Sequence, residues 1–85
     1  MPSARSKRVA ERRRRRNAPL RSAARTYVTK VRRLIESEEV GAAEQAVQQA
    51  IVALDKAAQK GAIHRRNAAR RKSRLMAQLN SARDA

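Results

Sequence analysis

Residues 41–61 read GAAEQAVQQAIVALDKAAQKG, a stretch bounded by the only two glycines of the chain. Its apolar residues recur every three or four positions, at Ala43, Val47, Ala50, Ile51, Leu54, Ala57 and Ala58. This spacing is typical of one face of an α-helix and fits no β-strand. Lys56 and Lys60 suit the negative end of the helix dipole, and Gly61 is expected just after the helix, at C′. We therefore predict a helix at about 42–60.

The same spacing on both sides of this stretch predicts two more helices. The upstream stripe comprises Leu20, Ala24, Tyr27, Val28, Val31, Leu34 and Ile35. The downstream stripe comprises Ile63, Ala68, Leu75, Met76, Leu79 and Ala82. With helices at about 17–40, 42–60 and 64–83, the predicted fold class is all-α, a three-helix bundle with a long, basic first helix.

The residues between these stripes predict where the helices begin and end. Gly41 is expected either to close the first helix at C′ or to cap the second at its N-terminus. His64 stands at the N-cap position of the third helix, and Ile63 and Ala68 are spaced as the two halves of a hydrophobic staple.

The start of the first helix has two interpretations. Asn17-Ala18-Pro19 is typical of a fresh helix start, because Asn caps well and Pro is tolerated in a first turn. On that basis residues 1–16 form a separate basic arm, frayed alone and helical on a polyanion, and residues 17–85 form the bundle. If a single helix runs through instead, we expect it to kink at Pro19.

Charge is the strongest compositional feature of the chain. The 85 residues contain 22 Lys and Arg against 7 Asp and Glu, a formal net charge of +15. Residues 1–33 carry +12, residues 34–62 carry −3 and residues 63–85 carry +6. Leu, Ile, Val and Phe account for only 14 residues, a composition close to that of disordered chains. We therefore expect helices that are marginal until a partner supplies negative charge.

Several classes of function are excluded by what the chain lacks. Without Cys there is no disulfide framework, thiolate nucleophile or zinc ribbon, and one His cannot anchor a metal site. Tyr27 is the only aromatic residue and lies on the apolar stripe, so we expect it in the core and no base-stacking platform. No apolar run approaches a membrane span or a signal peptide. We expect a soluble cytoplasmic protein that is not an enzyme, with no cofactor, metal, small-molecule substrate or membrane partner.

The arginines are placed where they can contact phosphates. Arg12–Arg16 cover every side of a helix turn, which leaves no face for packing on protein. In the first helix, Arg21, Arg25 and Arg32 lie across from Leu20, Val31 and Leu34. In the third, Arg66, Arg70 and Arg74 form a row that faces away from Leu75 and Leu79. Arg outnumbers Lys 17 to 5, and the guanidinium fork favours bidentate phosphate contacts.

Two stretches of the chain resemble a known family. Residues 60–75, KGAIHRRNAARRKSRL, are similar to the signature of the bacterial small-subunit ribosomal protein numbered twenty. Asn17, Arg21-Ser22, Arg25-Thr26 and Lys30-Val31 fall where that family carries the same residues. The resemblance implies a three-helix bundle whose first and third helices lie along 16S-type ribosomal RNA, which it binds directly and stabilises during assembly and translation. Pro19 departs from the unbroken first helix of the family.

The candidate RNA-binding residues combine the basic faces with the small polar residues beside them, which can bond phosphate or ribose hydroxyl groups. They are Ser6, Lys7, Arg8, Arg12, Arg13, Arg14, Arg15, Arg16, Asn17, Arg21, Ser22, Arg25, Thr26, His64, Arg65, Arg66, Asn67, Arg70, Arg71, Lys72 and Arg74. The expected partner is small-subunit ribosomal RNA within the ribosome, and we expect no homo-oligomer.

Two alternatives come from other classes. Residues 67–74, NAARRKSR, resemble the basic region of a leucine-zipper DNA-binding protein, but only 11 residues follow Arg74, too few for a stable zipper. A cationic amphipathic protein of the membrane surface should carry Trp, Phe and Leu on its apolar face, whereas these faces are rich in Ala.

Overall fold

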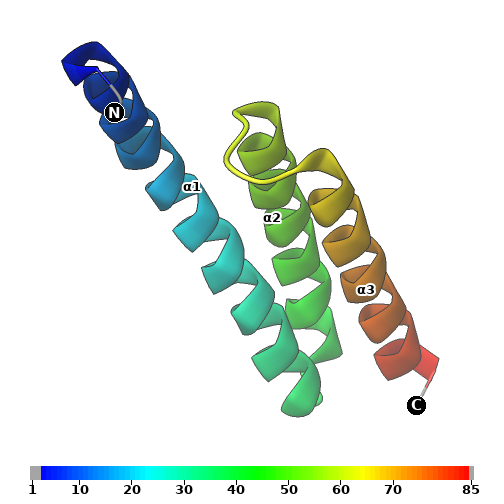
Figure 1. The fold of residues 1–85 in the computed structure, drawn as a ribbon. Coiled ribbons are helices and arrows are strands. Elements are labelled where there is room, and N and C mark those ends of the chain that lie inside the picture. Colours follow the sequence, from blue (N-terminus) through cyan, green and yellow to red (C-terminus); the bar gives the residue numbers. More distant parts are fainter. Residues whose placement is uncertain (1–2, 85) are drawn as a thin grey trace.

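A computed structural model describes residues 3–84 of the chain. Three helices account for nearly all of this range: α1 (Ala4–Glu36), α2 (Val40–Gln59) and α3 (Arg65–Asp84), and no strand occurs in it. α2 lies between α1 and α3, and the first part of α1 extends beyond the other two helices (Figure 1). The molecule is elongated, with extents of 56 × 20 × 18 Å. The expected all-α bundle with a long first helix is confirmed.

The core is built mostly by α2 because this helix packs on both of its neighbours. Its largest fully buried side chains include Leu54 of α2, Val31 of α1, and Leu75 and Leu79 of α3, all in one cluster. The half-buried Tyr27 packs against the same cluster, as its position on the apolar stripe predicts. The remaining buried members of the cluster are Ala24, Ala43, Ala46, Val47, Ala50 and Ala68, whose small side chains let the helix backbones approach closely.

The turn between α1 and α2 differs from the sequence-based expectation. α1 ends at Glu36, and Gly41 lies inside the first turn of α2 instead of closing or capping a helix. The C′ position is taken by Glu38, at φ 61°. The Glu38 N–H donates to the Ile35 carbonyl and the Glu39 N–H to the Leu34 carbonyl, at 3.0 and 2.9 Å, which is a Schellman turn.

The turn between α2 and α3 forms as the sequence predicts. Gly61 follows the C-cap with φ 76°, a left-handed conformation that glycine adopts without a steric penalty. His64 caps α3: its Nδ1 accepts a hydrogen bond from the Arg66 N–H at 3.1 Å. Ile63 and Ala68 both join the core, in keeping with a staple around this cap.

The expected helix start at Asn17 to Pro19 is wrong. α1 begins at Ala4, where the Ser3 hydroxyl accepts from the Ser6 N–H at 3.2 Å, and it runs through Pro19 as one uninterrupted helix (Figure 1). Asn17 caps nothing, since its Oδ1 is buried without a hydrogen-bond partner. The residues after Pro19 pack on α2 and hold this part of the helix. Upstream of Pro19, each further helical residue adds one backbone hydrogen bond, and together these bonds offset the one that is missing because proline has no N–H.

Candidate nucleic-acid interface

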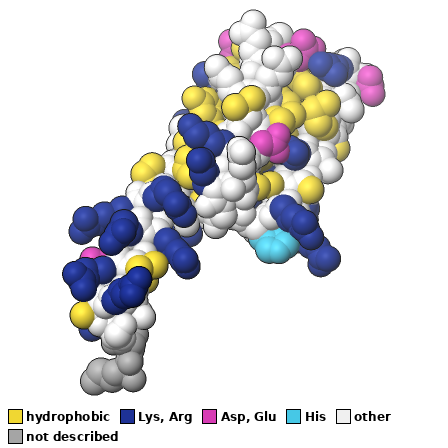
Figure 2. All heavy atoms as spheres, turned by 90° about the horizontal axis from the view of Figure 1, so that it is seen from above, with side chains coloured by type: hydrophobic (Ala, Val, Ile, Leu, Met, Phe, Trp, Pro, Cys, Tyr) yellow, Lys and Arg dark blue, Asp and Glu magenta, His cyan; other side chains and the backbone are white. Residues whose placement is uncertain are grey.

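The N-terminal part of α1 is a basic arm whose residues all face solvent. Every residue from Ser3 to Arg16 is exposed, because this stretch lies beyond the ends of the other helices and has no apolar stripe to bury. Lys and Arg side chains cover the protruding arm (Figure 2). Ser6 is an exception among the expected binding residues here, since its N–H and hydroxyl bond to the Ser3 hydroxyl at the helix cap.

One side of α1 carries arginines along most of its length. Arg14, Arg21, Arg25 and Arg32 are spaced by 7, 4 and 7 residues, which places them on the same side of a continuous helix. All four are exposed. A helix that started at Asn17 would have left Arg14 outside the helix that carries Arg21, Arg25 and Arg32. The row of four was therefore not evident from the sequence.

The outer face of α3 places two more arginines in solvent. Arg66 and Arg70 are exposed and lie opposite the buried Leu75 and Leu79, as the spacing predicts. Arg70 donates from Nη2 to Oδ1 of Asn67, which holds the guanidinium along the helix surface.

The side of α3 that faces α2 is neutralised by carboxylates. Lys72 Nζ lies 2.6 Å from Asp55 Oδ1, and Arg83 Nε lies 2.9 Å from Glu44 Oε1. Both pairs are partly exposed, so each contributes at most about 1 kcal/mol to stability. Lys72 therefore points toward α2, apart from the other cations proposed to bind RNA.

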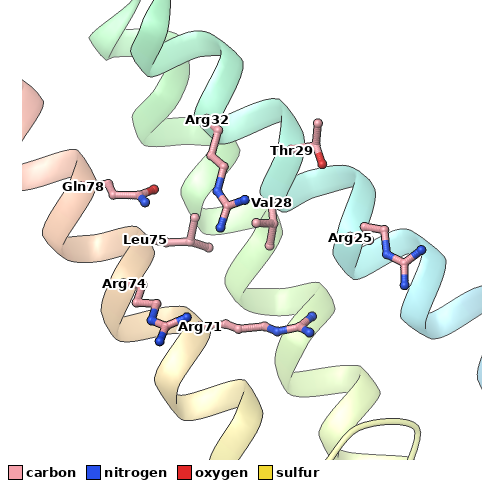
Figure 3. Close-up of a pocket in the computed structure, with 8 residues that line it drawn as sticks. All are labelled: Arg25, Val28, Thr29, Arg32, Arg71, Arg74, Leu75 and Gln78. Carbon is pink, nitrogen blue, oxygen red and sulfur yellow. The ribbon is translucent and has the colours of Figure 1, made fainter.

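The opposite side of α3 forms a groove with α1. Arg32 of α1 and Arg71 of α3 extend from the two helices into the space in front of α2 (Figure 3). No carboxylate lines this groove, whose floor is apolar. Arg32 was expected among the arginines across from the apolar stripe of the first helix, but a single helical pattern does not show that this flank of α1 faces α3. The lining residues are Arg25, Val28, Thr29, Arg32, Arg71, Arg74, Leu75 and Gln78.

The remaining expected residues occupy two places. Ser22 and Thr26, one turn apart, are exposed on another side of α1. Arg65 is exposed beside His64 at the start of α3.

Residues 3–84 bring no three His, Cys, Asp or Glu side chains together as a metal site would require. None of the helices in this range is both long and apolar enough to cross a membrane.

Comparison with known proteins shows to which family this chain belongs. The profile of the family described as Ribosomal protein S20 matches residues 2–80. The chain belongs to the ribosomal protein S20 family. This confirms the family that residues 60–75 resemble. Because S20 proteins are structural components of the ribosome, it also confirms the expected ribosomal location and the expectation that the chain is not an enzyme.

Individual S20 proteins match the chain over most of its length. The small ribosomal subunit protein bS20 of Thermomicrobium roseum is 53% identical over 79 residues, 93% of this chain and 80% of that protein. The bS20 protein of Dehalococcoides mccartyi is 49% identical over 75 residues, 88% of this chain and 85% of the relative. That of Alcanivorax borkumensis is 47% identical over 81 residues, 94% of this chain and 92% of the relative.

The fold of this S20 chain also leaves little basis for the two alternatives. Leu75 and Leu79, which would form the seam of a zipper after the basic region, are buried in the bundle core. Because the same packing covers the apolar stripe of α3, that stripe is not presented to a membrane surface.

Proposed function

We propose that this chain binds small-subunit ribosomal RNA directly, through its basic arm and the arginine-rich sides of α1 and α3. The observation that carries the proposal is the shortage of internal partners for its cations. Within residues 3–84, Lys72 and Arg83 are the only basic side chains that pair with a carboxylate. The remaining cations repel one another in the protein alone and are stabilised when phosphates approach.

The shape of α1 supports an extended RNA contact. Its 33 residues at about 1.5 Å per residue form a rod of roughly 50 Å, with cations on every side at Arg12–Arg16 and along one side further on. The helical backbone sets the spacing of these arginines along the rod, so several phosphates of one RNA can be neutralised together.

Binding of this kind stabilises a folded RNA. Segments of RNA that come together in a compact structure repel through their phosphates, and a cationic helix between them lowers that repulsion. The apolar core fixes the angle between α1 and α3, so the two basic surfaces are presented in one arrangement. The proposed role is therefore structural, in the assembly of the small subunit and during translation.

A filter-binding comparison tests the proposal. Small-subunit ribosomal RNA, duplex DNA of random sequence and anionic lipid vesicles are titrated with the chain across a salt series, with excess tRNA as competitor. We expect tight binding to the ribosomal RNA that persists at moderate salt and in the presence of tRNA. Equal affinity for random duplex DNA would contradict a structured ribosomal RNA site, and preference for vesicles would replace it with the membrane alternative.

A further inference from the structure

The two flanks of α3 differ in electrostatic character. On the flank toward α2, Lys72 forms a salt bridge with Asp55, and Arg83 forms one with Glu44. On the flank toward α1, cations face cations: Arg71 and Arg74 of α3 line the same groove as Arg25 and Arg32 of α1. The bundle is thus complementary on one side of its third helix and repulsive on the other.

The groove has the form of a small anion site. Arg25 and Arg32 of α1 and Arg71 and Arg74 of α3 line it, with Arg32 and Arg71 extending into it (Figure 3), and no Asp or Glu is among its lining residues. Val28 and Leu75 form an apolar floor, which excludes water from one side of a bound anion and strengthens the interaction with the arginines. The Gln78 side chain extends from α3 toward the groove, where its amide can add a neutral donor at the edge (Figure 3).

We propose that this groove holds one phosphate group of an RNA strand, which bridges α1 and α3. The inference rests on the proposed function, since it names the group that the RNA contributes at this point. A phosphodiester has two unesterified oxygens, so it can accept hydrogen bonds from guanidinium groups on both helices at once. The arginine row of α1 leads into the groove, which places the bridging phosphate in line with those bound along the arm.

A bridging phosphate also completes the fold. It replaces repulsion between α1 and α3 with a link between them, and a ligand that binds only the folded state raises its stability. Arg71, Arg74 and their partners on α1 therefore lower the stability of the chain without RNA and raise its affinity for RNA. Opposite effects on stability and affinity separate this role from a purely structural one.

Two matched single variants test the opposite effects. Arg71→Gln and Arg83→Gln each remove one arginine from α3, the first from the groove and the second from the pair with Glu44. We expect Arg71→Gln to leave the Tm of the free chain unchanged or raise it by about 2–4 °C, and Arg83→Gln to lower it by a similar amount. Affinity for small-subunit ribosomal RNA should fall about fivefold or more for Arg71→Gln and by less than twofold for Arg83→Gln. Equal losses of Tm in the two variants would overturn the proposal.

A double-mutant cycle tests whether one anion contacts both helices. Inorganic tripolyphosphate is titrated into the chain, Arg32→Gln, Arg74→Gln and the double variant at constant ionic strength, with the dissociation constant read from the shift in Tm. If the two arginines hold the same anion, the loss in the double variant is smaller than the product of the single losses. Independent losses that multiply would contradict a shared phosphate. Repeating the cycle with ribosomal RNA separates the two sources: coupling with tripolyphosphate alone would contradict an RNA phosphate in the groove.

The failure of this inference can be told from the failure of the proposed function. Arg66→Gln/Arg70→Gln removes two charges from the outer face of α3, outside the groove. If that variant weakens binding to ribosomal RNA and Arg32→Gln/Arg74→Gln does not, the groove proposal falls and direct RNA binding stands. If neither variant changes the affinity, direct binding through these helix sides falls as well.

Discussion

Glu38 is the residue at which the backbone of the described chain is most strained. It is the only non-glycine residue of residues 3–84 with positive φ, at 61°, and it closes α1 in a position where glycine is common. Glu38→Gly should stabilise the fold by about 0.5–1 kcal/mol, which corresponds to a rise in Tm of about 2–8 °C in thermal unfolding followed by circular dichroism.

The matching variant at the other turn should act in the opposite direction. Gly61→Ala places a Cβ at φ 76°, and although no atom lies within 4 Å of that Cβ, the conformation itself is disfavoured. We expect this variant to lower the free energy of unfolding by about 1 kcal/mol.

For Glu38→Gly, a fall in Tm instead of a rise would show that the Glu38 side chain makes a favourable interaction larger than the backbone strain.

At the scale of the helix, Pro19 is the weak point of α1. It cannot donate to the Arg15 carbonyl, and a proline within a helix costs about 3 kcal/mol relative to alanine. Pro19→Ala should therefore raise the helix content of the free chain, measured by far-ultraviolet circular dichroism, mainly through the arm upstream of residue 19. Ser22→Ala, an exposed change inside the same helix, serves as the control and should have a much smaller effect. Unchanged helicity in Pro19→Ala would indicate that the arm is already fully helical.

Local sequence signals predicted some of these elements well and others poorly, for identifiable reasons. The helical stripes and the ends at Gly61 and His64 were predictable, because periodic burial and a left-handed glycine leave direct patterns. The continuity of α1 was not, since it depends on whether packing after Pro19 outweighs a local penalty. The role of Glu38 was hidden by Gly41, a nearby residue better suited to the same conformation.

The basic residues of the candidate interface were predictable from the sequence, but their arrangement across neighbouring helices was not. Charge and spacing identify Arg12–Arg16 and the outer arginines of α3, and the structure leaves these exposed. The pairing of Lys72 with Asp55 and the approach of Arg32 to Arg71 depend on which flanks of the helices meet. That information lies in the angle between helices, which a single stripe does not specify.

At the scale of the whole molecule, net charge and a small core predict that folding depends on solution conditions. Like charges four residues apart, such as Arg21 and Arg25, oppose their helices by about 0.2–0.5 kcal/mol each. Salt screens this repulsion, with a Debye length of about 10 Å at 0.1 M. Helix content of the free chain should therefore rise with salt and rise further with ribosomal RNA, measured by circular dichroism after subtraction of the RNA signal. A sharp, high-temperature unfolding transition at low salt would contradict this expectation.

The salt dependence of ribosomal RNA affinity tests most directly whether the cations of this molecule contact phosphates. Arg13→Gln/Arg15→Gln removes two charges from the arm, and Lys56→Gln/Lys60→Gln removes two exposed charges near the end of α2. If the arm contacts phosphates, the first variant binds more weakly and its plot of log affinity against log salt is less steep by about 1.5, while the second stays close to the original chain. Identical affinity and slope for the original chain and both variants would contradict direct binding of RNA by the arm.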